Sequence, residues 1–128
     1  MSPPAARIGD RIVAIDMHLI QPPPIATPVM VPHPFSGIID AGVSRNVTIG
    51  GAAAATVDST ATNTPPHLPI GGTFVNPPSN QGTITAGSAT VTINGKAAAR
   101  AGDQARTCDD TGRIGGLVVA TGKVFIGG

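Results

Sequence analysis

Three histidines and a single cysteine are the residues of this 128-residue chain best suited to chemistry. Imidazole nitrogen and thiolate sulfur are donors that tetrahedral Zn²⁺ accepts, with bonds of about 2.0–2.3 Å. No Cys-x-x-Cys spacing groups them locally, and the four are His18, His33, His67 and Cys108. We expect each to lie in a loop, so a shared site depends on whether those loops converge.

Other interpretations of these four residues stay open on the sequence. A lone histidine in a loop usually faces solvent, and a lone cysteine is usually a small buried hydrophobe. A cysteine–histidine nucleophilic pair is the rival chemistry, but no third orienting residue or oxyanion signature accompanies it. If the four share a metal, four protein ligands favour a structural site, because catalytic zinc keeps a position for water.

An internal repeat indicates how the loops are arranged. Residues 90–103 read TVTINGKAAARAGD, and residues 46–59 read NVTIGGAAAATVDS. The second half of this pattern recurs as PAARIGD at 4–10, and the first half recurs as KVFIGG at 123–128. We interpret the chain as three copies, the last of which is cut at its turn and continued at the N-terminus. This predicts a closed, pseudo-threefold object in which equivalent loops meet at one end.

Within each copy, alternating apolar residues predict β-strands. We expect strand pairs at 38–51, 84–95 and 117–128. Between them we expect loops at 11–37, 58–83 and 104–116, the first of which is rich in proline and therefore stiff and extended. The Asn94-Gly95 pair is a strong hairpin-turn signal. The alanine runs are too short to form helices alone, so the sequence predicts an all-β chain.

A second feature of the repeat is an arginine and an aspartate three residues apart around a glycine. The pairs are Arg7 with Asp10 and Arg100 with Asp103. Such spacing predicts a tight turn closed by an ion pair or by a side-chain-to-backbone hydrogen bond. If the ion pair is exposed, it contributes only about 0–1 kcal/mol, so its main effect is to fix the turn.

The composition favours one domain over residues 1–128 that lacks a large aromatic core. The chain has no Trp or Tyr, three Phe, 17 Gly, 13 Pro and a formal charge of +1. No basic and aromatic cluster suggests nucleic-acid binding. No segment approaches the roughly 20 apolar residues of a membrane span, and no signal peptide is apparent. We therefore expect synthesis in the cytoplasm and export by a route other than ordinary secretion.

The repeated sequences PAARIGD and GSATVTINGKAAARAGD resemble the PAAR-repeat family over essentially the whole chain. The resemblance implies a small cone-shaped β fold of three strand repeats with long loops. It also implies one structural Zn²⁺ near the apex, held by three histidines and one cysteine. Two copies depart from the family pattern: Ala97 replaces the proline, and Thr56 stands at the arginine position.

Members of this family cap a trimeric VgrG-like spike, one copy per trimer, in type VI secretion and related contractile injection systems. By this resemblance we expect a structural spike tip and not an enzyme. We also expect the tip to contact a target membrane. Whether it carries effectors non-covalently stays open. The chain ends on its last repeat strand, so no fused effector domain is expected. The alternative is a small zinc hydrolase or toxin. We expect the spike to meet the strand edges beside Val47, Ile49, Val91, Ile93, Val124 and Ile126.

Overall fold

The protein is built of β-strands joined by turns and loops. The computed structural model describes residues 2–24 and 26–128, and these residues contain no helix. Within the same ranges, nothing therefore qualifies as a helix long and apolar enough to cross a membrane. The predicted all-β class is confirmed.

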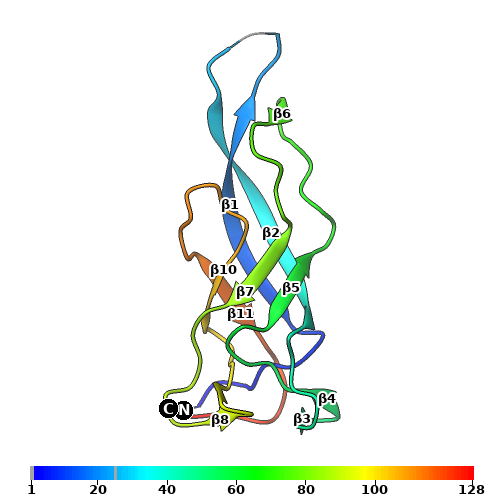
Figure 1. The fold of residues 1–128 in the computed structure, drawn as a ribbon, viewed down its shortest axis with the longest axis vertical. Coiled ribbons are helices and arrows are strands. Elements are labelled where there is room, and N and C mark those ends of the chain that lie inside the picture. Colours follow the sequence, from blue (N-terminus) through cyan, green and yellow to red (C-terminus); the bar gives the residue numbers. More distant parts are fainter. Residues whose placement is uncertain (1, 25) are drawn as a thin grey trace.

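Six antiparallel strands close into a ring that forms the middle of the molecule (Figure 1). Around the ring, each strand pairs with the next and the last pairs with the first. The ring order is β1 (Arg11–Gln21), β2 (Val29–Ala41), β5 (Thr60–Asn63), β7 (Gln81–Ile84), β10 (Gln104–Arg106) and β11 (Gly116–Val119). The short β6 (Thr73–Phe74) joins the far end of β1, and the β1–β2 hairpin rises above the ring (Figure 1).

Two small hairpins lie at the opposite end of the molecule, which we call the base (Figure 1). They pair β3 (Thr48–Ile49) with β4 (Ala52–Ala53), and β8 (Thr92–Ile93) with β9 (Lys96–Ala97). Asn94 and Gly95 turn the second hairpin with φ values of 53° and 82°, which is the left-handed backbone that this turn type requires. Where a third hairpin would lie, Pro4 bridges to Phe125, so the two ends of the chain complete the third copy.

A ring of three backbone hydrogen bonds gives the base its pseudo-threefold symmetry. Ala6 N–H donates to Ala99 C=O over 2.9 Å, Ala99 to Ala55 over 3.1 Å, and Ala55 to Ala6 over 3.0 Å. All three alanines are fully buried. A side chain larger than a methyl group would force these three backbones apart, which explains the alanines in every copy.

Two apolar clusters fill the interior. The cluster in the base joins the alanine before each ring position to one isoleucine per copy; its members are Ala5, Ile49, Ala54, Ile93, Ala98 and Ile126. The cluster inside the closed sheet combines the ring alanines with larger side chains, namely Ile12, Phe35, Ile39, Ile84 and Val118. Small residues from three copies thus replace the aromatic core that the composition lacks.

The predicted loop at 11–37 is wrong over most of its length, because it forms the long hairpin of β1 and β2. Pro32 and Pro34 lie within β2 and pair across from β1 in register. Alternate residues of a strand direct their backbone nitrogens to the same side, so the nitrogens of Pro32 and Pro34 face the same side as that of Ser36. The Ser36 N–H points away from β1, toward Asn63. On that side β5 pairs with β2 only from Gly37 onward. The prolines therefore remove no ladder hydrogen bond, as on an edge strand.

In two of the three copies, the arginine of the turn motif ties the copy to the next one. Asp10 and Asp103 accept hydrogen bonds from the backbone N–H of Arg7 and Arg100 over 2.9 and 2.7 Å. The guanidinium of Arg7 donates to the Ile49 and Gly50 carbonyls over 3.0 and 3.3 Å. That of Arg100 donates over 3.1 Å to the carbonyl of Gly127, which matches Gly50 in the repeat.

At the third equivalent position, the shorter Thr56 leaves a cavity of about 150 Å³ against Ile93 and Asn94. The Asn94 side chain instead donates to Ser44 Oγ over 2.7 Å and to Asn46 Oδ1 over 3.0 Å. At the matching turn position of the first hairpin, a Cβ on Gly50 would lie 2.5 Å from Arg7 Nη1. A side chain at Gly50 therefore requires the Arg7 guanidinium to move, whereas Thr56 leaves the side chain of Asn94 room at the matching turn position.

We predict that Gly50→Ala destabilises the protein more than Gly51→Ala does. Both glycines have positive φ, so each alanine costs about 1–2 kcal/mol of backbone strain. Only the Gly50 methyl also displaces Arg7, which adds about 1 kcal/mol for the lost hydrogen bonds. Urea denaturation measures both variants. Equal losses, or a difference that persists in an Arg7→Ala background, would contradict this role of Arg7.

Candidate metal centre

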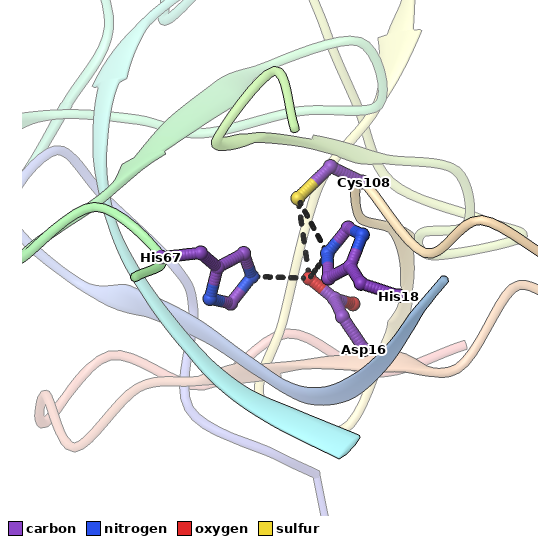
Figure 2. Close-up of side chains that lie close together, drawn as sticks. All are labelled: Asp16, His18, His67 and Cys108. Carbon is purple, nitrogen blue, oxygen red and sulfur yellow. Dashed lines mark hydrogen bonds and ion pairs between the residues drawn. The ribbon is translucent and has the colours of Figure 1, made fainter. Parts of the chain in front are cut away.

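Four side chains that could hold a metal ion come together from distant parts of the sequence, beyond the part of β1 that closes the ring with β11 (Figure 2). Asp16 and His18 come from β1, His67 from the segment between β5 and β6, and Cys108 from the segment between β10 and β11. One donor atom from each lies within 4.8 Å of all the others. Asp16 and His18 are fully buried.

Strand alternation explains why β1 brings its donors inward. Ile12, Asp16, His18 and Ile20 share one parity along the strand, and all are 0% exposed. Ile15, of the opposite parity, is 54% exposed. Successive side chains of a strand point to opposite faces, so a strand that buries Ile12 and Ile20 also buries the polar residues between them.

His33 belongs to the same cluster of rings. The prediction that His18 and His33 lie in a loop is wrong: His18 lies in β1, and His33 lies in β2, where it pairs in register with Asp16. The centroid of the His33 ring lies 5.3 Å from that of His18 and 5.6 Å from that of His67. His33 Nδ1 lies 2.8 Å from the Val31 carbonyl, whereas its buried Nε2 has no hydrogen-bond partner among the described residues.

Asp16 occupies the centre of the cluster (Figure 2). Its Oδ2 lies 2.9 Å from His67 Nε2, 3.3 Å from Cys108 Sγ and 3.9 Å from His18 Nε2. Its Oδ1 accepts a hydrogen bond from the Thr107 hydroxyl. Among the described residues, its only ion-pair partners are histidines. A buried carboxylate without a fixed cation is costly, which favours a bound cation here.

Cys108 is a protonated thiol when no metal is bound. Burial raises the pKa of Cys108 to about 12, assisted by the nearby Asp16 carboxylate and by the hydrogen bond that the thiol donates to it. Its Sγ also lies 3.7 Å from His18 Nε2. Metal binding requires the thiolate, so a cation entering this site would displace the thiol proton.

The segment that carries Cys108 is tied directly to β1. Asp109 accepts a hydrogen bond from Met17 N–H over 2.9 Å, and Asp110 accepts one from Leu19 N–H over 2.8 Å. Asp110 also lies 3.2 Å from His18 Nδ1, which leaves Nε2 of that ring directed at the cluster. Burial alone would raise the pKa of Asp109, but hydrogen bonds from Thr111 and Met17 lower it.

Two phenylalanines enclose the histidines. Phe74 of β6 lies 5.5 Å from His18 and 5.4 Å from His33 between ring centroids, and Phe35 lies 6.0 Å from His67. Phe35 is 2% exposed and belongs to the core. These contacts cover part of the surface of the histidine rings.

The donor set fits a divalent cation that accepts nitrogen and sulfur. A central carboxylate, two imidazoles and a thiol lie within 4.8 Å of one another, and the ring of His33 with its buried Nε2 lies beside them. Softer ligands of this kind suit Zn²⁺ and related transition metals better than Mg²⁺ or Ca²⁺. When bound, such a cation would supply a cross-link between β1 and the two segments that carry His67 and Cys108.

Comparison with protein families gives a match over the part of the chain that carries the longer motif and Cys108. Residues 76–128 match the family model described as PAAR motif. These residues carry a PAAR motif. The predicted resemblance to the PAAR-repeat family is confirmed over them. The match supports a role as a spike-tip protein of a contractile injection system, in a family that is structural. No curated protein matches the chain in a sequence search.

The structure places the predicted metal ligands and partner-binding residues in two regions. His18, His67 and Cys108 come together with the His33 ring beside them, as described above. At the base, Val91 and Val124 are 37% and 45% exposed, and Val47 is partly buried. In each copy an isoleucine follows two residues after the valine and lies just beneath this surface; these are Ile49, Ile93 and Ile126, at 7%, 8% and 8% exposure.

Sequence reasoning missed Asp16 and the roles of Thr107 and Asp110. The signal for Asp16 was present, because Ile12, Ala14, Asp16, His18 and Ile20 alternate as one face of a strand. The prolines of the same segment led to its interpretation as a loop, which hid that alternation. Asp110 gives no local signal, since its partner His18 lies 92 residues away.

We predict that His33→Leu has opposite effects on the two forms of the protein. Without metal, the substitution removes a buried nitrogen that lacks a partner, so the free energy of unfolding is unchanged or higher. With zinc, the substitution removes a ligand and lowers the melting temperature. Thermal denaturation with chelator and with zinc measures both effects.

His67→Leu is the matched control for this experiment. His67 keeps an Asp16 partner at 2.9 Å in the absence of metal, so its loss should destabilise both forms. A His33→Leu variant that is equally destabilised with and without zinc would show that His33 has no role as a ligand.

Proposed function

We propose that this protein is a structural spike tip that caps a trimeric VgrG-like spike, one copy per trimer, with a zinc-pinned upper end. The observation that carries the proposal is the ring of backbone hydrogen bonds between Ala6, Ala55 and Ala99. One chain thereby presents three equivalent surfaces about a single axis. Such a base fits the end of a threefold trimer, because each copy can meet an equivalent edge.

The apolar surface of the base supports docking. Val91, Val124 and Phe125 are exposed there, at 37%, 45% and 58%. Buried isoleucines lie directly beneath, so the surface is rigid as well as apolar. Exposed apolar residues beside short strands suit addition to the strand edges of a β-structured partner.

The donor cluster supports a role in resisting force along the axis. It joins the middle of β1 to the two segments that carry His67 and Cys108. Zinc held by His18, His33, His67 and Cys108 would keep these segments from separating when the tip meets a membrane. The donors fill the site with protein groups, an arrangement typical of structural zinc; we therefore propose no catalysis and no zinc-hydrolase or toxin activity.

The route follows from the same proposal. The protein would be made in the cytoplasm, assembled on the spike there, and delivered out of the cell or into a target cell by the contracting machine. An effector carried by contact is compatible with this route.

We predict that the purified protein contains about one zinc per chain and co-purifies with a VgrG-like trimer encoded beside it. Val124→Glu should reduce spike binding by at least tenfold, because it places a charge on the docking surface. Leu117→Glu is the matched control, since Leu117 is 48% exposed but lies on the flank of the closed sheet. Elemental analysis and surface plasmon resonance measure the two properties.

The two parts of the proposal fail separately. A folded wild-type protein without metal would remove the pinned upper end. Equal loss of binding in both valine and leucine variants, or no loss in either, would remove the docking surface at the base.

A further inference from the structure

We propose that Asp16 binds the metal directly, so that the site is a mixed carboxylate, imidazole and thiolate centre. This inference rests on the proposed zinc site and adds a ligand to the three histidines and one cysteine. The residue lies on the inward face of β1, is fully buried, and reaches the cluster with one oxygen.

The distances around Asp16 Oδ2 are those of a ligand. Around a five-coordinate zinc with bonds of about 2.0–2.3 Å, neighbouring donors at angles of about 90–120° lie about 2.8–4.0 Å from one another. Oδ2 lies 2.9 Å from His67 Nε2, 3.3 Å from Cys108 Sγ and 3.9 Å from His18 Nε2. The separation of Cys108 Sγ from His18 Nε2, 3.7 Å, falls in the same range.

The contacts of the histidines show which of two roles Asp16 fits, a direct ligand or a partner that orients a ligating histidine from outside. A carboxylate that only orients a ligating histidine binds the ring nitrogen that faces away from the metal. That outer position is filled by Asp110 at Nδ1 of His18, and by the Val31 carbonyl at Nδ1 of His33. Asp16 instead meets Nε2 of His67 and Sγ of Cys108, on the inner side where the donors converge (Figure 2).

Charge balance supports the same assignment. A divalent cation bound by the Cys108 thiolate and three neutral imidazoles keeps a net charge of +1 in a buried site. Adding the Asp16 carboxylate makes the centre neutral, which removes the cost of burying net charge. Thr107 holds the other oxygen of Asp16, so Oδ2 alone is directed at the cluster.

Spectroscopy of the metal-loaded protein tests this assignment. X-ray absorption of the zinc form should show one sulfur and four nitrogen or oxygen neighbours in the wild type, and one fewer light neighbour in Asp16→Asn or Asp16→Ala. Visible absorption of the Co²⁺ form should change from a weak five-coordinate spectrum to a stronger four-coordinate one. Zinc affinity, measured by competition with a chelating dye, should fall by more than about 100-fold in Asp16→Ala, beyond the loss typical of an outer partner.

Thr107→Val is the matched control, because it removes the hydrogen bond to Oδ1 and leaves Oδ2 in place. It should retain the wild-type spectra. If the Asp16 variants do not fold, the wild type is compared with His33→Leu. A wild type with four light neighbours supports the assignment, as does one with three that stay unchanged in His33→Leu, because Asp16 then completes the set with His18 and His67. Three light neighbours that fall to two in His33→Leu, or spectra that do not change in folded Asp16 variants, would overturn the assignment while leaving the zinc site intact. A folded wild type that binds no metal would overturn both.

Discussion

Three backbone hydrogen bonds between buried alanines are the constraint on which the rest of this structure depends. They join Ala6, Ala55 and Ala99 from three copies of the repeat, and they close only because each side chain is a single methyl group. The turns that follow direct β1, β5 and β10 away from the base in equivalent directions. Each of those strands begins one side of the closed sheet, so the convergence of distant segments above the base follows from this ring.

At the upper end, the end opposite the base, the described residues form no comparable backbone ring, and polar side chains hold the segments together instead. Asp109 and Asp110 bind the backbone of β1 through two N–H groups, and Asp16 binds His67 and Cys108. These polar groups are buried, so they stabilise the protein only if their charges and hydrogen bonds are satisfied. A cation that accepts the unpaired His33 Nε2 satisfies the set. The same cation joins segments that a core of alanines and isoleucines leaves apart.

The repeat made the fold and the base predictable, because identical short sequences must form identical turns. The four donors were predictable by type, since the chain has few residues that bind transition metals. The strands around the site were not predictable, because Pro32 and Pro34 are compatible with a strand only where β5 ends and leaves β2 unpaired. Asp16 was missed because residues 11–21 were interpreted as a loop. Its role appears only when residues 11–21 are recognised as a strand with one buried face.

The most direct measurement is hydrogen exchange with and without a chelator, followed amide by amide. The central claim is that backbone bonds hold the base while a metal holds the upper end. Chelation should therefore speed exchange at Met17 and Leu19, whose N–H groups bind Asp109 and Asp110, by at least tenfold. Exchange at Ala6, Ala55 and Ala99 should not change. Equal exchange with and without metal at Met17 and Leu19, in a protein shown to bind zinc, would contradict the account.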